Sequence, residues 1–268
     1  RHDKHDYKYR KNIDGKYTEE KGKSLLEALK DEEWDYIVFQ QASSFAGQYS
    51  SYFPELKELM EYVKANATNP NVKYAMQQTW AYAKDSNHPG FFRYGKNQKA
   101  MYEDVVFSYD KAAQKQNISI VIPTGTAIQN GRTSYLGDTF NRPDGTMYYH
   151  LETTYGRYTA ACTWFSALLG DVRHNTYQPE TVNDNQAKIA RQSAYAAIQE
   201  PDKVTDMSRY DPPISFESPV YVDFGSGKSS SPWNNVTISA ATVPVTLVDA
   251  NGNNTGLKLT VSNDFENY

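Results

Sequence analysis

The stretch Asp35–Gln48, DYIVFQQASSFAGQ, begins as an apolar run and ends abruptly in amides, hydroxyls and a glycine. Apolar side chains do not alternate with polar ones in Tyr36–Phe39, which is typical of a strand that is buried on both faces. The polar cluster, which starts with Gln40 and Gln41, follows the carboxyl end of this strand. Open parallel α/β sheets bind their ligands at the carboxyl ends of the strands. We therefore expect a functional site where this strand ends.

Two further apolar runs end in the same way. Residues 72–80 finish in Gln78, a threonine and a tryptophan, and Ile118–Ile122 precedes a polar segment that contains Asn130. Apolar residues recur with helical spacing between and after these runs, at 54–66, 96–116, 153–169 and 179–198. Strands that alternate with helices predict an α/β fold with a parallel sheet and right-handed connections. All the polar strand ends should then meet at one edge of the sheet.

The chain before the first strand carries weaker signals. Residues 1–22 are polar and rich in glycine and lysine, so we expect a loop there. Ser24 and Glu27 have the spacing of a capping box, in which each side chain binds the backbone of the other residue. This pattern predicts a short helix that ends at about Lys30.

The composition changes after residue 200. Residues 201–213 are rich in Asp, Lys, Pro and Ser, which is typical of a linker. Short alternating runs separated by Asn and Gly turns follow, and they predict β-strands. We therefore expect an α/β domain over 1–200, a linker over 201–213 and an incomplete β-rich module over 214–268. The chain starts with RHDKH and ends with NDFENY, and we expect both ends to be cut from a longer protein.

Length and charge exclude some classes of function. A chain of 268 residues with 39% hydrophobic content can bury one sizeable core. Its net charge of −4, without a dominant basic run, argues against a nucleic-acid partner. No apolar run approaches the ~18 residues of a membrane span. The five histidines show no metal-binding spacing, so we expect no metal and no other cofactor.

His150 is the candidate base of the predicted site, whereas His88 in Asn-His-Pro-Gly is expected to be an exposed turn residue. Four uncharged donors are expected around the same edge: Gln40, Gln41, Gln78 and Asn130. Amide donors near a histidine suit acyl transfer, because a developing oxyanion needs hydrogen bonds without a competing positive charge. On the pattern alone, a surface histidine and amides satisfied by the ends of strands remain the alternatives.

Four segments together resemble an SGNH/GDSL-type hydrolase: Trp34–Ser43, Gln78–Tyr82, Pro123–Arg132 and Asp144–Ala161. More narrowly, they resemble a domain-of-unknown-function branch found in secreted proteins of carbohydrate-foraging bacteria. The resemblance covers about residues 20–175. It implies a flavodoxin-like three-layer sheet, a serine esterase that acts on an acylated carbohydrate or small ester, and a secreted, periplasmic or cell-surface location.

The resemblance also implies roles for individual residues. His150 would be the general base, and Gln40 or Gln41 would take the place of an oxyanion-hole asparagine. Asp144 would orient His150, with Asp138 as the alternative. The nucleophile of the superfamily lies in a Gly-Asp/Asn-Ser motif after the first strand, and we expect that segment to lie upstream of this chain. The chain alone is then expected to be inactive on aryl acetates.

Two other classes of function stay open at this point. A carbohydrate-binding or scaffolding protein on a degenerate form of the same fold fits the 22 Tyr and 4 Trp, because aromatic faces stack on sugars. A nucleotide-binding protein with a flavodoxin-like fold would need a phosphate-binding loop after its first strand. The sequence shows no such glycine-rich or Ser/Thr-rich loop there.

Overall fold

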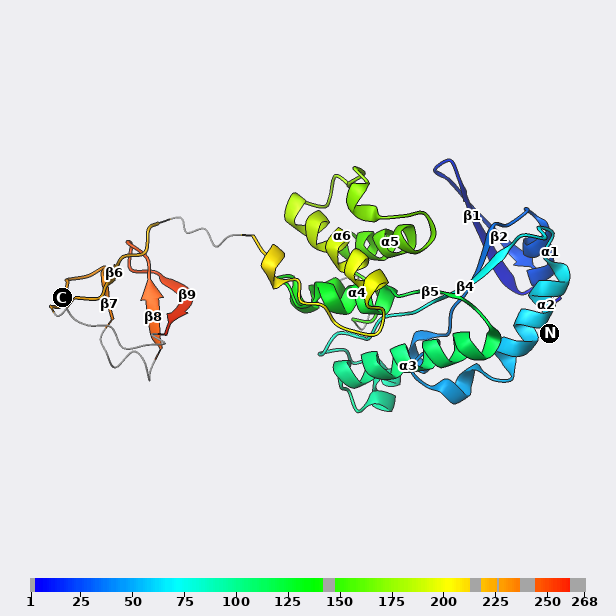
Figure 1. Ribbon diagram of the computed structural model, residues 1–268, viewed down its shortest axis with the longest axis horizontal. Helices are drawn as coiled ribbons and strands as arrows, with labels where there is room; N and C mark the ends of the chain where they lie inside the picture. Colours follow the sequence, from blue (N-terminus) through cyan, green and yellow to red (C-terminus); the bar gives the residue numbers. More distant parts are fainter. Residues whose placement is uncertain (1–2, 142–147, 213–217, 226, 237–243, 261–268) are drawn as a thin grey trace. The chain divides into compact units, whose positions relative to one another are not determined.

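The structure, a computed structural model, describes residues 3–141, 148–212, 218–225, 227–236 and 244–260. The chain divides into two compact units, Arg1–Asp211 and Pro212–Tyr268. The first unit is of mixed α/β type and contains a parallel sheet (Figure 1). The sheet has the order β3-β4-β5, with strands β3 (Tyr36–Phe39), β4 (Lys73–Gln77) and β5 (Ile120–Ile122). The predicted α/β class and parallel sheet are therefore confirmed.

Helices pack against this sheet from both sides. Figure 1 draws α3 on one side of β4 and β5, while α4, α5 and α6 gather on the other. The helices of the first unit are α1 (Leu25–Lys30), α2 (Glu55–Asn66), α3 (Gln98–Gln116), α4 (Thr124–Gly131), α5 (Tyr155–Leu168) and α6 (Asp184–Gln199). One hydrophobic cluster joins β3 and β4 to α2 and α3, and includes the buried side chains of Phe39, Met60, Met76 and Tyr109. The core thus fixes where the strand ends lie.

The polar segment that follows β5 forms the helix α4. Threonine and glycine favour helices only weakly, so tertiary packing decides the structure here. Gly125 lets the helix approach the end of β4, because a Cβ atom at this position would lie 2.3 Å from the carbonyl oxygen of Thr79. Most of α4 is buried as a result, including Asn130.

The loop expected over residues 1–22 is wrong, because an antiparallel hairpin occupies most of it. Strands β1 (Tyr7–Ile13) and β2 (Lys16–Lys23) pair around Asp14 and Gly15, which both have positive φ angles. An Asp-Gly turn of this kind suits the twist of a two-stranded hairpin. The hairpin is largely exposed, so its sequence lacks the alternation that marks a half-buried strand. The capping box that opens α1 is confirmed.

Residues 201–211, for which the sequence predicts a linker, belong to the first unit in the structure. The backbone N–H of Thr205 donates to the Asn130 side chain at 2.7 Å, and that of Met207 donates to the Thr133 hydroxyl at 2.7 Å. The Met207 side chain is 1% exposed. Met207 is the only large apolar side chain of residues 201–211 that is buried, so the segment has the composition of a linker. It nevertheless packs against α4, where Met207 joins the same hydrophobic cluster as Ile128.

The second unit is rich in short strands, as predicted for the C-terminal region. The strands in its described part are β6 (Val222–Asp223), β7 (Asn234–Asn235), β8 (Val245–Val248) and β9 (Asn254–Leu259). Asn234 ties them together, because its Nδ2 donates to the carbonyl oxygens of Tyr221 and Val248 at 2.8 Å. Across the described part of both units, no helix has the length and apolar character needed to cross a membrane.

Candidate functional site

Two short 3₁₀ helices come together beyond the carboxyl ends of β3 and β4. η1 (Ser43–Phe45) follows β3, and η3 (Pro89–Tyr94) lies in the long connection between β4 and α3. They meet at Gly90, where a Cβ atom would lie 2.4 Å from Cβ of Ser44 and 3.0 Å from Nδ1 of His88. Only glycine fits this contact. The close approach brings the serines of η1 next to a histidine that the sequence did not single out.

His88 is half-buried rather than an exposed turn residue. Its Nδ1 accepts a hydrogen bond from the backbone N–H of Gly90 at 3.0 Å, so the neutral ring carries its proton on Nε2. The ring packs against Tyr82 and Tyr149, with centroid distances of 4.8 and 4.6 Å. Burial lowers the pKa of His88, and the positive charge of Arg93 and the proximity of His150 lower it further. His88 is therefore neutral near pH 7.

His150 is an exposed side chain that also packs against Tyr149. The centroids of the Tyr149 and His150 rings are 4.1 Å apart. Two hydrogen bonds hold the backbone of Tyr149 and His150. Nδ2 of Asn141 donates to the His150 carbonyl oxygen at 3.2 Å, and the indole of Trp80 donates to the Tyr149 carbonyl oxygen at 2.7 Å. The predicted base thus has a defined backbone position and a ring that is open to solvent.

A hydroxyl pair completes this group of side chains. The Ser43 hydroxyl and the Tyr82 hydroxyl are hydrogen-bonded at 2.9 Å. Tyr82 is fully buried, and burial raises its pKa, so its phenol is protonated at neutral pH. We call Ser43, Tyr82, His88, Tyr149 and His150 together the imidazole cluster. It offers two imidazoles of different exposure and three hydroxyls, two of which are hydrogen-bonded to each other, at the carboxyl end of a parallel sheet.

The two glutamines that follow β3 stay at this edge. The Gln40 side chain is exposed. The Gln41 side chain is half-buried and donates to the Ser51 carbonyl oxygen at 3.0 Å, while its own oxygen accepts from the backbone N–H of Ala42 at 2.8 Å. Gln41 therefore shapes the loop, and Gln40 is the amide that faces solvent.

The other two predicted donors lie inside the fold. Gln78 is 3% exposed, and its amide oxygen accepts from the backbone N–H of Thr126 at 2.9 Å. Asn130 is 0% exposed and links the Ser193 carbonyl oxygen to the backbone N–H of Thr205. These bonds join α4 to its neighbours. Gln78 and Asn130 therefore serve packing in the structure, and their part in a ligand site stays a prediction.

The two candidate partners of His150 are Asp144 and Asp138. Asp144 lies outside the described residues. Asp138 accepts from the backbone N–H of Lys84 at 2.9 Å and from the Gln98 amide at 2.7 Å, and it forms an ion pair with Arg132 at 3.1 Å. Asp138 thus belongs to a polar network around Arg132. Among the described residues, no three His, Cys, Asp or Glu side chains form a group that could hold a metal ion.

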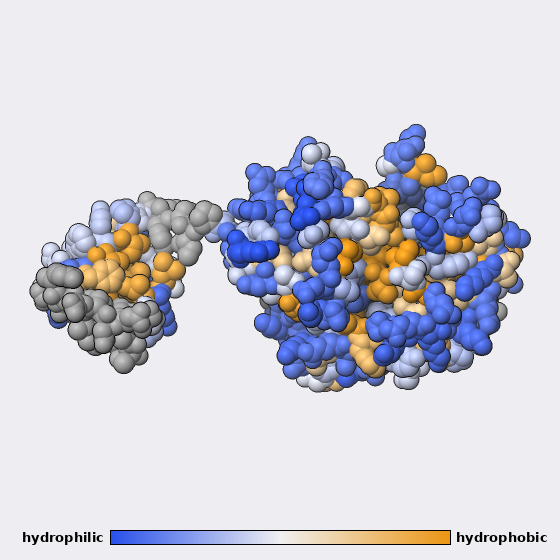
Figure 2. All heavy atoms as spheres, viewed as in Figure 1, coloured by the Kyte–Doolittle hydropathy of each residue, from blue (hydrophilic) through white to orange (hydrophobic). Residues whose placement is uncertain are grey.

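A groove of about 390 Å³ runs along β3 and reaches Gln40 and Gln41. Apolar side chains of β3, α1 and α2 form most of its lining: Leu25, Leu29, Ile37, Val38 and Leu56. Within the described part of the chain, β3 pairs only with β4, so its other edge is open. Figure 2 also shows hydrophobic side chains gathered near β5, where Figure 1 draws the sheet. An open edge beside an apolar groove can take another strand.

Comparisons with known proteins agree with one another. The family model described as a domain of unknown function, DUF4886, matches residues 1–197. A crystal structure of a DUF4886 family protein from Bacteroides uniformis is similar, with 46% sequence identity and a TM-score of 0.73. The match covers 76% of this chain and 78% of that chain. No curated protein matches. The chain therefore belongs to the DUF4886 family of domains of unknown function.

Proposed function

We propose that this chain forms most of a serine ester hydrolase of the SGNH type that acts on an acylated carbohydrate outside the cytoplasm. The observation that carries the proposal is the imidazole cluster at the carboxyl end of the parallel sheet. There His150 is exposed, while His88 is buried enough to have a lowered pKa. Two groups of the same type in different environments can take different roles in acyl transfer.

His150 is proposed as the general base. Its exposed ring can approach a nucleophile and a substrate, and an imidazole nitrogen can take a proton from a hydroxyl and return it to the leaving group. Asp144 is proposed to orient it, since a carboxylate that accepts from the ring selects the tautomer in which the other nitrogen is free. Within the described residues, the fixed backbone of Tyr149 and His150 supports this role.

His88 is proposed as a donor to the developing oxyanion. Its Nδ1 is occupied by the Gly90 N–H, so Nε2–H is the group that can donate. A neutral imidazole stabilises an oxyanion without a competing positive charge in the ground state. Gln40 is the second proposed donor, because it is the exposed amide at the end of β3.

The nucleophilic serine is proposed to come from a strand outside residues 1–268 that pairs with the open edge of β3. The apolar groove beside Ile37 and Val38 supports this placement, because a strand with apolar side chains would fill it. Its carboxyl end would then lie next to η1. Ser43 is the internal alternative, although its hydroxyl is engaged with Tyr82.

Two exposed aromatic rings support a carbohydrate substrate. Phe45 in η1 is 41% exposed and Phe92 in η3 is 67% exposed. Basic side chains lie over both, Arg93 at 4.3 Å from the Phe45 centroid and Lys96 at 4.5 Å from the Phe92 centroid. Aromatic faces of this kind stack on sugar rings. Phe92→Ala should therefore raise KM for an acetylated oligosaccharide and leave KM for an aryl acetate unchanged.

The test compares hydrolysis of aryl acetates by the 268-residue chain and by a longer polypeptide from the same gene that includes an upstream Gly-x-Ser strand. We expect activity only in the longer form. His150→Ala should reduce kcat by about 10²–10⁴-fold, the usual contribution of a general base. His174→Ala, at an exposed histidine of η5 (Val172–His174), is the matched control and should have no effect. An active longer form that tolerates His150→Ala would contradict the proposed base.

A carbohydrate-binding protein without catalysis is the second candidate, and the exposed Phe45 and Phe92 rings favour it. The two functions differ in one measurement. A binding protein would retain acetylated oligosaccharides in calorimetry and lose them on Phe92→Ala, yet neither form of the polypeptide would hydrolyse them. The ester hydrolase would release acetate.

A further inference from the structure

We infer that Arg132, acting through Asn141, is a positioning residue for the imidazole cluster. It holds the backbone of Tyr149 and His150 in place, and it does so from inside the first unit without touching the reacting groups. The inference rests on the proposed role of His150 as base. Its structural part can be tested without any activity.

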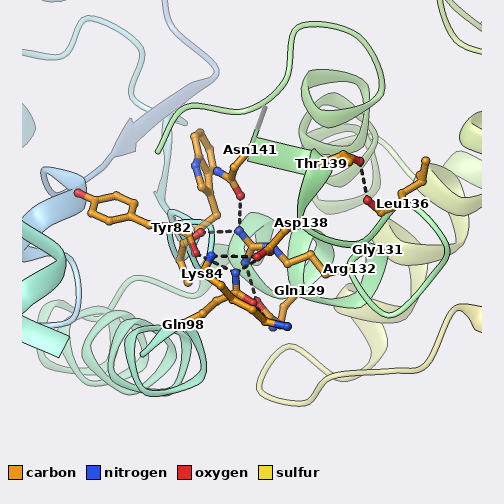
Figure 3. A network of polar contacts seen from close by, with 12 residues as sticks. Tyr82, Lys84, Gln98, Gln129, Gly131, Arg132, Leu136, Asp138, Thr139 and Asn141 are labelled. Atoms are coloured by element: carbon orange, nitrogen blue, oxygen red, sulfur yellow. Dashed lines mark hydrogen bonds and ion pairs between the residues drawn. The ribbon is translucent and has the colours of Figure 1, made fainter. Parts of the chain in front are cut away.

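Arg132 stands at the end of α4, and its side chain is 4% exposed. Its contacts are drawn in Figure 3. Nη1 donates to the Gln129 amide oxygen at 2.7 Å, and Nη2 donates to the Ala81 carbonyl oxygen at 2.8 Å and to the Asn141 amide oxygen. Nε lies 3.1 Å from Asp138. A buried guanidinium with this many partners has one orientation.

The guanidinium decides which way Asn141 points. Arginine can only donate hydrogen bonds, so Asn141 must turn its oxygen toward Arg132. Its NH₂ group then faces Tyr149 and His150. Nδ2 lies 3.2 Å from the His150 carbonyl oxygen and 3.4 Å from the Tyr149 carbonyl oxygen. Asn141 is 1% exposed, so water does not compete for these bonds. Arg132 therefore orients the Asn141 amide, and Asn141 in turn holds the backbone of Tyr149 and His150.

A second segment is held by the same guanidinium. Arg132 binds the Ala81 carbonyl oxygen, and the neighbours of Ala81 bind the histidine segment directly. The Trp80 indole donates to the Tyr149 carbonyl oxygen at 2.7 Å, and the backbone N–H of Ala83 donates to the Tyr148 carbonyl oxygen at 3.1 Å. Residues 80–83 and 148–150 therefore lie side by side. Between Ala81 and Ala83 is Tyr82, another member of the imidazole cluster.

Two matched substitutions separate this role from general stability. Asn141→Asp keeps an acceptor for Arg132 but replaces the NH₂ donor by a carboxylate oxygen, which repels the two carbonyl oxygens. Gln129→Glu makes the same change of charge at another partner of Arg132 and touches neither Tyr149 nor His150. The measurement is hydrogen exchange by NMR of the Trp80 indole and the Ala83 amide in the 268-residue chain. Both groups donate to the histidine segment.

We expect Asn141→Asp to speed exchange at both sites by about tenfold or more and to shift the His150 ring resonances, with the α3 amides unchanged. Gln129→Glu should leave exchange at both sites as in the wild type. Unchanged exchange in Asn141→Asp, or equal changes in the two variants, would overturn the inference. If Asn141→Asp does not fold, Trp80→Phe replaces it, because it removes one donor to Tyr149 and leaves Arg132 intact; it should speed exchange at Ala83.

In the longer polypeptide, Asn141→Asp should lower kcat by about tenfold and leave KM within about twofold, because a misplaced base affects the reaction more than binding. Loss of fold would change both together. If the exchange result holds but His150→Ala has no effect on hydrolysis, the proposed function fails and the positioning network stands. If the exchange result fails while His150 remains essential, only the positioning inference is lost.

Discussion

The Arg132 side chain is charged although it is almost completely buried in the first unit. Burial lowers the pKa of Arg132 to about 10, and the nearby carboxylate of Asp138 opposes that shift. The guanidinium is therefore charged at neutral pH and depends on its partners. Removing one member of a buried ion pair leaves the other without compensation, which is costly in a medium that holds little water.

We expect Arg132→Met to reduce the free energy of unfolding by about 3 kcal/mol, the lower end of the range for broken buried pairs, because Asp138 keeps some contact with water. Urea denaturation followed by circular dichroism measures this. Arg157→Met, at an exposed arginine of α5, is the control and should change stability by less than about 0.5 kcal/mol. Equal losses in the two variants would show that the buried pair contributes little.

His88 should make the stability of the first unit depend on pH. Its pKa is lowered in the folded protein by burial, by Arg93 and by His150, so the unfolded chain binds the proton more readily. The free energy of unfolding should then fall as pH drops from about 7 through the ordinary histidine pKa of about 6.5 toward the lowered value.

His88→Asn tests this dependence, because the asparagine oxygen can replace Nδ1 as the acceptor for Gly90 but does not titrate. Chemical denaturation at pH 7.5 and at pH 5.5 should show a smaller loss in this variant than in the wild type. His174→Asn should behave as the wild type. A wild-type loss that persists in full in His88→Asn would assign the dependence to other groups.

Among the elements, α4 shows what sequence periodicity cannot predict. The strands β3, β4 and β5 were predictable because each is a short apolar run bounded by polar residues. The α4 sequence contains threonines and glycines that favour other structures, and only contacts with the rest of the fold select a helix. The hairpin of β1 and β2 was missed because most of its side chains are exposed on both faces. Burial creates the pattern that prediction uses.

Gly125→Ala tests the close packing of α4 against the end of β4. The added methyl group would meet the Thr79 carbonyl oxygen and the Gln78 amide, so the helix must shift. We expect a loss of about 1–3 kcal/mol, typical of overpacking, in thermal denaturation of the first unit. Gly227→Ala is the control, because a Cβ atom there has nothing within 4 Å. A neutral Gly125→Ala would mean that the helix is packed more loosely.

The candidate site was only partly predictable, because contacts between distant parts of the chain decide which side chains meet there. The glutamines after β3 were singled out because polar residues follow the end of a buried strand, and that rule is independent of packing. His88 was missed because its sequence context, Asn-His-Pro-Gly, also describes an ordinary turn. Its environment depends on the aromatic rings of Tyr82 and Tyr149. Tyr149 lies far from His88 in the sequence, and only folding brings the two rings together. Gln78 and Asn130 show that an amide near a strand end can serve packing as well as binding, and the sequence does not separate the two roles.

At the scale of the whole chain, the division into units depends on where residues 201–211 pack. Met207 is buried, and the backbone N–H groups of Thr205 and Met207 donate to Asn130 of α4 and to Thr133, which follows α4. Residues 201–211 should therefore be required for the stability of the first unit, whereas Pro212–Tyr268 should not.

Two truncations test this division. A chain that ends at Asp211 should melt at the same temperature as the first transition of the whole protein. A chain that ends at Glu200 loses the buried Met207 side chain, worth about 1.5–3 kcal/mol, and should melt several degrees lower, at about 2–4 °C per kcal/mol. Scanning calorimetry measures both. Equal melting temperatures for the two truncated chains would show that residues 201–211 act as a linker after all.

The most direct test of the proposed function is to identify the serine that reacts with a fluorophosphonate, which traps an activated serine hydroxyl. Mass spectrometry of the longer polypeptide should find the label on one serine of the upstream strand, and His150→Ala should prevent labelling while His174→Ala does not. The 268-residue chain alone should remain unlabelled. Labelling of Ser43 or Ser44 would place the nucleophile inside this chain, and the absence of labelling in both forms would contradict serine ester hydrolysis at the imidazole cluster.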